Sequence, residues 1–271
     1  EVSLSTVPVE TKDFHLGVNL SYYRNKEELI RLQYPKMKED INNGLFVGYP
    51  VNGVHYNYKQ VGIWQENEAD LAAIYGQKPG EVKVADLDGN GKIDGNDKTY
   101  FGYSQRPDYV LGLLGGFRYK NFEISMQWTA GLHASRMLSG EYRNAFGSTN
   151  GRALLKFLAD GRWTPENPDA RFPRLTFLNK SHYLEDSDLW LMDGSYLRLK
   201  VAEIGYTFRD IPAFRKVGVK SLKVYFSGYN LLTLFSDLND IDIDPEGATS
   251  GSNIDSYPNV RIFNFGVNIT F

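Results

Sequence analysis

The strongest pattern in the chain is an alternation of apolar and polar side chains over segments of about ten residues. One such segment runs from Phe14 to Tyr22, where every second residue is apolar. Alternation of this kind gives a β-strand one apolar face and one polar face. It predicts further strands over 54–65, 109–119, 122–130, 196–208, 220–231 and 261–271, so we expect an all-β protein with about seven strands.

The clearest pair of strands is a hairpin, formed by 109–119 and 122–130 around a two-residue connection. This short connection fixes the register and places Phe117 opposite Ile124. Asn tolerates positive φ, so we expect Asn121 to supply that conformation in the turn. One face of the hairpin is then apolar and the other polar.

Local signals predict one irregularity and three short helices. Within 196–208 the apolar residues change from odd-numbered to even-numbered positions, which predicts a β-bulge at 200–202. The helices are expected over 25–32, over 68–75 with Asn67 as N-cap and Gly76 after its end, and over 152–160 with Gly161 after its end.

The connections between strands alternate in length. They are short at 120–121 and 209–219, and long at 131–195 and 232–258. Outer-membrane barrels show this asymmetry, with short periplasmic turns and long extracellular loops. We therefore expect a partial antiparallel transmembrane β-barrel. The alternative is a secreted, calcium-stabilised β-sandwich for adhesion or scaffolding, because alternation alone does not say whether the apolar face meets lipid or a second sheet.

The segment 86–97, DLDGNGKIDGND, matches a twelve-residue calcium loop with Gly91 at the sharp-turn position. The flanks are extended, so a structural ion is expected rather than a helix-moving switch. Position 12 carries Asp97 in place of the usual Glu. The alternative is a turn rich in Asp, Asn and Gly without metal. The expected Ca²⁺ ligands are Asp86, Asp88, Asn90, the carbonyl of Lys92, Asp94 and Asp97.

Composition excludes several classes of function. The chain of 271 residues has a formal net charge of −3 and no Lys/Arg cluster, which disfavours nucleic acid and anionic lipid as partners. It has no cysteine, and no apolar run is long enough for a membrane-spanning helix. No catalytic motif is present, so an enzyme is not expected. The four histidines are scattered: His15, His55, His133 and His182.

An acidic stretch near the C-terminus offers a second candidate cation site. A solvated acidic loop is the alternative interpretation. Its carboxylates are Asp237, Asp240, Asp242, Asp244 and Glu246.

Several motifs, in this order and spacing, resemble the C-terminal part of the SusC/RagA family of TonB-dependent outer-membrane transporters. They are GIWQ (62–65), the 86–97 loop, RWTPENPDARFPRL (162–175), LWLMDGSYLRLK (189–200), VYFSGYNLLT (224–233), DPEG (244–247) and the terminal aromatic strand. The resemblance covers nearly the whole chain, 1–271. It implies roughly the last third of a plugged, ~22-stranded barrel, with the plug, the TonB box and the signal peptide outside these residues.

The resemblance also implies a function. The full barrel would import a polar nutrient, an oligosaccharide or a peptide, across the outer membrane of a Gram-negative, Bacteroidetes-like cell. Its implied partners are a SusD-like surface lipoprotein, TonB and outer-membrane lipid. Tyr225 and Tyr229 are weak candidates for contact with the polar substrate, since tyrosine stacks on and hydrogen-bonds to such ligands. Packing against the plug is the alternative role of these two side chains.

Overall fold

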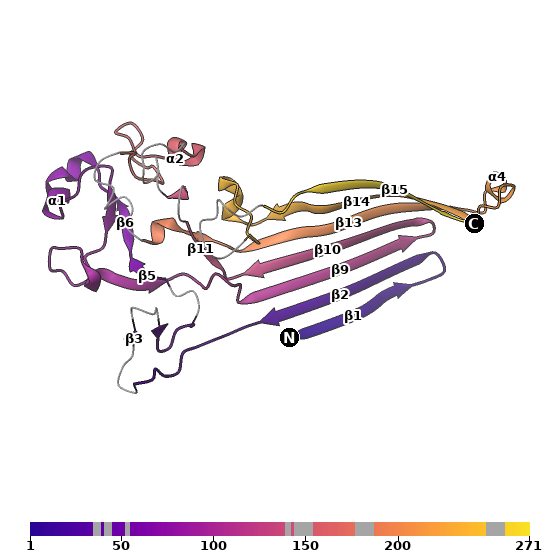
Figure 1. Ribbon diagram of the computed structural model, residues 1–271, viewed down its shortest axis with the longest axis horizontal. Coiled ribbons are helices and arrows are strands. Elements are labelled where there is room, and N and C mark those ends of the chain that lie inside the picture. The colour runs from indigo at the N-terminus through magenta and orange to yellow at the C-terminus, as the bar shows by residue number, and fades with distance from the viewer. Residues whose placement is uncertain are drawn as a thin grey trace.

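Seven strands form one antiparallel sheet in the order β1-β2-β9-β10-β13-β14-β15 (Figure 1). The computed structural model describes residues 1–34, 39–40, 45–51, 55–138, 142–143, 154–176, 187–247 and 258–271. The strands of the large sheet are β1 Val2–Glu10, β2 Phe14–Arg24, β9 Tyr109–Tyr119, β10 Phe122–Leu132, β13 Tyr196–Arg209, β14 Ser221–Leu234 and β15 Ile262–Thr270.

The register of the sheet sorts side chains by character onto its two faces. Residues that oppose one another across neighbouring strands lie on the same face. One such row is apolar from edge to edge: Val9, Leu16, Phe117, Ile124, Ile204, Phe226 and Phe265. The row beside it, on the other face, is polar or glycine: His15, Arg118, Glu123, Gly205, Tyr225 and Gly266.

The apolar face of the sheet is exposed rather than packed. Phe265 is 73% exposed and Ile204 is 44% exposed. The four other sheets in the described part of the chain have two strands each, so none matches the large sheet in size. The β-sandwich alternative is therefore wrong, and the sheet has the amphipathic form of a barrel wall. Since this barrel is partial, it is not closed.

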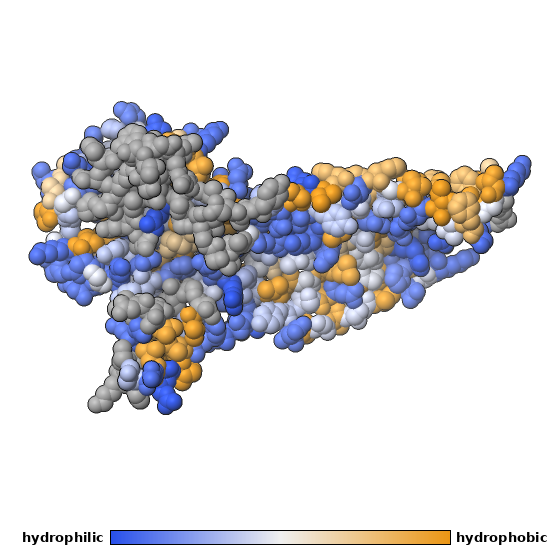
Figure 2. Space-filling view, in the orientation of Figure 1, coloured by the Kyte–Doolittle hydropathy of each residue, from blue (hydrophilic) through white to orange (hydrophobic). Residues whose placement is uncertain are grey.

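The two ends of the sheet differ in their connections. The short turns after β1, β9 and β13 lie at one end together with the C-terminus, and the turn after β13 contains helix α4, Pro212–Arg215 (Figure 1). The long connections gather at the other end. We call their described residues, between β2 and β9, β10 and β13, and β14 and β15, the loop head. Figure 2 shows orange residues gathered along one edge of the sheet, over β14 and β15.

The loop head contains small sheets, short helices and most of the buried apolar side chains. Its strand pairs are β3 Glu39–Asp40 with β4 Leu45–Phe46, β5 His55–Tyr58 with β8 Lys98–Phe101, β6 Gln60–Ile63 with β7 Val82–Val84, and β11 Ser135–Met137 with β12 Leu191–Asp193. Its helices are α1 Ala69–Ile74 and α2 Lys156–Asp160, with 3₁₀ turns η2 Glu66–Glu68, η3 Gly95–Asp97, η5 Asp188–Trp190 and η6 Asp237–Ile241. One core cluster joins Leu138, Leu158, Phe172, Trp190, Met192, Leu238 and Ile241.

Two sequence predictions about the sheet are confirmed in detail. Phe117 opposes Ile124 in the hairpin. The bulge falls on Lys200, because Leu199 and Val201 pair with consecutive residues of β10. The turn itself differs from the prediction: Lys120, not Asn121, has the positive φ, at 54°.

Other predictions are wrong in ways that long-range pairing explains. Strand β1 was not predicted, yet it forms one edge of the large sheet and brings its strand number to seven. The segment 54–65 instead forms β5 and β6 of the loop head, although residue 54 lies outside the described part. The described residues over 25–32 form no helix.

The two remaining helices form with different boundaries. Gln65, not Asn67, begins the η2–α1 region, where its backbone N–H donates to Glu68 at 3.1 Å. Gly76 follows the helix with φ 68°, as expected. Helix α2 begins at Lys156; residues 152–153 lie outside the described part. Among the described residues, no helix is long and apolar enough to cross a bilayer.

Candidate functional site

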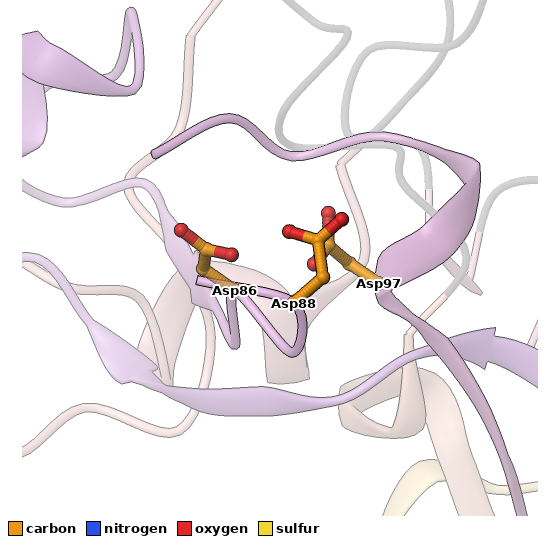
Figure 3. A group of neighbouring side chains, drawn as sticks. All are labelled: Asp86, Asp88 and Asp97. Atoms are coloured by element: carbon orange, nitrogen blue, oxygen red, sulfur yellow. The ribbon is translucent and has the colours of Figure 1, made fainter. Parts of the chain in front are cut away.

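The acidic loop at 86–97 joins strand β7 to strand β8 through η3, so its flanks are extended as expected. Three of its carboxylates, those of Asp86, Asp88 and Asp97, have oxygen atoms within 4.8 Å of one another (Figure 3). Carboxylates at this separation repel one another unless a cation lies among them. Hard oxygen donors of this kind suit Ca²⁺.

Asp86 is held in place by the glycine-rich turn that follows it. Its Oδ1 accepts from Gly89 N at 2.7 Å and its Oδ2 from Gly91 N at 2.8 Å. Both glycines have positive φ, 71° and 78°, a conformation that L side chains adopt at a cost. Desolvation opposes the charge of Asp86, but hydrogen bonds from the backbone N–H groups of Gly91, Gly89 and Asn90 outweigh it and hold its pKa below the ordinary value.

Asp97 closes the loop from its other end. Its side chain is fully buried, and it accepts from Leu87 N at 2.7 Å and from Asp94 N at 2.8 Å. The shorter arm at position 12 therefore ties the beginning and the end of the loop together. Each carboxylate oxygen keeps lone-pair capacity beyond one hydrogen bond, so these bonds do not exclude a cation.

Two of the other expected ligands, Asn90 and Asp94, accept hydrogen bonds from the loop's own backbone. The Oδ1 of Asn90 accepts from Lys92 N at 2.8 Å, and its amide nitrogen donates to Asp88 at 2.9 Å. Asp94 caps η3 by accepting from Asn96 N at 2.8 Å and lies outside the three-carboxylate cluster. Of the expected ligands, the structure thus brings together the carboxylates of Asp86, Asp88 and Asp97, at positions 1, 3 and 12 of the loop.

Buried hydrogen bonds and an ion pair hold the segments that precede the calcium-type loop. Trp64 donates its indole N–H to Gln77, which donates in turn to Val82 O at 3.1 Å. The buried Glu81 pairs with Arg174 at 2.9 Å. Trp163 donates its indole N–H to Gln65 at 3.0 Å and so joins the 62–65 and 162–175 motifs, which lie about one hundred residues apart in sequence.

Two carboxylates of the acidic stretch 237–246, those of Asp244 and Glu246, are paired with basic side chains. Asp244 and Glu246 pair with Arg198, at 2.8 Å and 2.6 Å, and the side chain of Arg198 is only 4% exposed. Arg136 donates to the carbonyls of Pro245 and Gly247 at 2.8 Å and 3.0 Å. Arg198 thus supplies the positive charge that Asp244 and Glu246 pair with. Sequence reasoning missed this network because its members are more than forty residues apart.

Hydrogen bonding to Arg198 also lowers the pKa of Asp244. Burial raises the pKa of Asp244, but hydrogen bonds from the Arg198 guanidinium and from the N–H groups of Glu246 and Asn259 outweigh it. The pKa of Asp244 therefore lies below its ordinary value.

Tyr225 and Tyr229 both lie on the polar face of β14. The Lys223 ammonium lies 5.4 Å from the Tyr225 ring centroid, and a Cβ added to Gly266 would collide with that ring. Tyr229 is 43% exposed. His15, His55 and His133 are held by different strands or loops and form no shared site, while His182 lies outside the described residues.

Comparison with known proteins finds relatives over the whole chain, although no family model matches. The TonB-dependent receptor P3 of Formosa agariphila is 30% identical over 100% of this chain and 28% of its own length. The TonB-dependent receptor SusC of Bacteroides thetaiotaomicron is 27% identical over 100% of this chain and 26% of its length. The chain thus spans about a quarter of these relatives.

The same comparison among solved structures supports the fold. The structure of the RagAB peptide transporter matches with a TM-score of 0.71 at 21% identity, over 99% of this chain and 28% of that chain. The RagAB peptide importer in its closed-closed state matches with a TM-score of 0.70. The proteins found are named as receptors and transporters.

Proposed function

The chain is part of an outer-membrane TonB-dependent receptor of the SusC/RagA family, fitting a C-terminal portion, and from this premise we propose that the whole protein imports a polar nutrient. The observation that carries the proposal is the sheet itself. Its apolar face extends across all seven strands, in the row from Val9 to Phe265, and is exposed, as a lipid-facing wall requires. Its other face carries Tyr, Ser, Asn, Gln and charged residues, as the wall of an aqueous lumen does.

The long connections then form the extracellular side of the proposed transporter. They lie together at the end of the sheet opposite the C-terminus (Figure 1). A SusD-like lipoprotein would cover this end, and energy would reach the barrel from TonB. The substrate is an oligosaccharide or a peptide; SusC and the RagAB peptide transporter, both similar to this chain, support import as the shared activity.

Import is tested by growth and uptake in the source cell. Deleting the gene for the whole receptor is expected to abolish energy-dependent uptake of one class of oligomer while uptake of monomers continues. A panel of fluorescently labelled oligosaccharides and peptides identifies that class. Unchanged uptake of every member of the panel would contradict the proposal.

We also propose that the 86–97 loop binds a structural calcium ion through Asp86, Asp88 and Asp97. The three converging carboxylates support this, and the resemblance to a twelve-residue calcium loop adds Asn90, Lys92 and Asp94 as further donors. A bound ion would neutralise the repulsion among the carboxylates and so stiffen the surface between β7 and β8.

The test is limited proteolysis of the whole receptor with Ca²⁺ or with a chelator. We expect Ca²⁺ to protect the 80–105 region, and the double variant Asp88→Asn/Asp94→Asn to lose that protection. Asp70→Asn, on the exposed face of helix α1, is the matched control and is expected to keep it. A cleavage pattern that does not respond to Ca²⁺ would rule out the metal.

A further inference from the structure

The apolar face of the sheet contains a hollow of about 670 Å³ near the long-loop ends of five strands. Its lining is almost entirely apolar, and the register places its large apolar side chains on the lipid-facing side. The principal lining residues are Leu4, Leu20, Tyr22, Leu113, Trp128 and Leu197. A wall that only contacts fluid lipid needs apolar side chains but needs no hollow of this size.

A belt of rings borders the hollow on the loop side. Tyr22 stacks on Tyr109 with ring centroids 6.3 Å apart. His133 meets Tyr109 edge-on at 5.0 Å and stacks on Tyr103 at 4.5 Å. Amphipathic rings of this kind mark the boundary between hydrocarbon and headgroups. The hollow therefore lies at the depth of acyl chains, directly inside that boundary.

The positively charged side chain of Arg24 lies on the same face, at the long-loop end of β2. Arg24 ends β2 opposite Tyr109, and its guanidinium lies 5.2 Å from the Tyr109 ring centroid. The nearby Asp108 lies 3.9 Å from His133. Among the residues that the structure describes, no carboxylate lies within ion-pair distance of Arg24. A guanidinium stacked on a ring keeps its N–H edge available for a phosphate.

We propose that the hollow and Arg24 together form a binding site for a phosphorylated acyl lipid of the outer leaflet. An acyl chain occupies the hollow, the ring belt contacts the glycerol or sugar backbone, and the phosphate binds Arg24. The order along β2, from Leu20 through Tyr22 to Arg24, matches the order of chain, interface and headgroup in such a lipid. The inference rests on the proposed function only in placing the long loops outside.

Native mass spectrometry of the detergent-solubilised whole receptor tests the site. Phosphatidic acid is titrated in, and phosphatidylcholine with the same acyl chains serves as the reference lipid. We expect phosphatidic acid to bind the wild type in preference, and Arg24→Gln to lower its affinity about tenfold, as loss of one charge-assisted contact predicts. Leu113→Trp fills the hollow and is expected to weaken both lipids.

The control is Arg209→Gln, which removes an exposed arginine at the opposite end of the sheet. It is expected to leave both affinities unchanged. Equal binding of the two lipids by the wild type, or equal losses in Arg24→Gln and Arg209→Gln, would overturn the site. Heat-dependent mobility on gels shows that each variant has assembled. Lipid binding is measured without transport, so failure of the import proposal would be seen separately.

Discussion

Replacing Arg198 by methionine tests the buried ion pairs of the loop head, because it keeps much of the bulk of the side chain and removes its charge. In the native protein this guanidinium pairs with Asp244 at 2.8 Å and Glu246 at 2.6 Å, and their side chains are only 9% and 15% exposed. Removing one partner of a buried ion pair costs about 3–5 kcal/mol. Lys200 still reaches Glu246 at 2.5 Å, so we expect the lower end, about 3 kcal/mol.

Hydrogen exchange of the whole receptor measures this cost locally. A loss of about 3 kcal/mol raises the opening equilibrium of residues 237–247 about 100-fold, so their amides are expected to exchange about 100-fold faster at pH 7. The amides of β9 and β10 are expected to keep their protection. Lys216→Met, at the opposite end of the sheet, controls for loss of any surface cation. Unchanged protection of 237–247 in Arg198→Met would refute the reasoning.

The pH dependence provides a second check with a definite sign. The folded pKa of Asp244 lies below its ordinary value of 3.8, so its stabilising contribution is complete above that pH and is lost as pH falls through the folded pKa. In Arg198→Met the buried carboxylate has lost its cation, and its pKa is expected to rise. Protection of the loop should then improve as pH falls toward 4, the reverse of the wild type.

Three further predictions concern other parts of the chain. Val267→Arg places a cation on the lipid-facing side of β15 at a cost of about 2–4 kcal/mol and is expected to block barrel assembly on heat-modifiability gels, whereas Ser125→Arg on the polar face assembles. Gly80→Ala is expected to expose the loop head to protease, because φ is +82° and the new Cβ would lie 2.5 Å from an indole carbon; Gly115→Ala meets no atom and should not. Burial lowers the pKa of His55 below 6.5, so the hydrogen-exchange protection factors of β5 and β8 should fall as pH falls through 6.5, and His55→Phe should abolish that dependence.

The large sheet could be predicted where strand and partner are close in sequence. The 109–132 hairpin has a two-residue turn, so its alternation fixes both the strands and their register. The edge strand β1 was missed because its alternation breaks between Thr6 and Val9, where Pro8 interrupts the pattern and the register shifts. The 54–65 segment was assigned to the wrong sheet, because alternation does not say which strand is the partner.

The candidate site was predictable to a similar extent. The spacing of the 86–97 loop indicates which side chains can converge, and Asp86, Asp88 and Asp97 do converge. It could not show that Asp94 also caps η3, because both roles need the same residue at the same spacing. The pairing of Arg198 with 244–246 joins two distant segments and leaves no local signal in the sequence.

The central claim is that one face of the sheet meets lipid, and spin labels along β15 test it most directly. Single cysteines are placed in turn at positions 263 to 268 of the whole receptor in lipid vesicles, and each is labelled. Collisions with oxygen, which dissolves in lipid, and with a water-soluble nickel chelate are then measured. We predict that labels at 263, 265 and 267 respond to oxygen, and that those at 264, 266 and 268 respond to nickel. Equal responses along the strand, or the opposite alternation, would contradict the account.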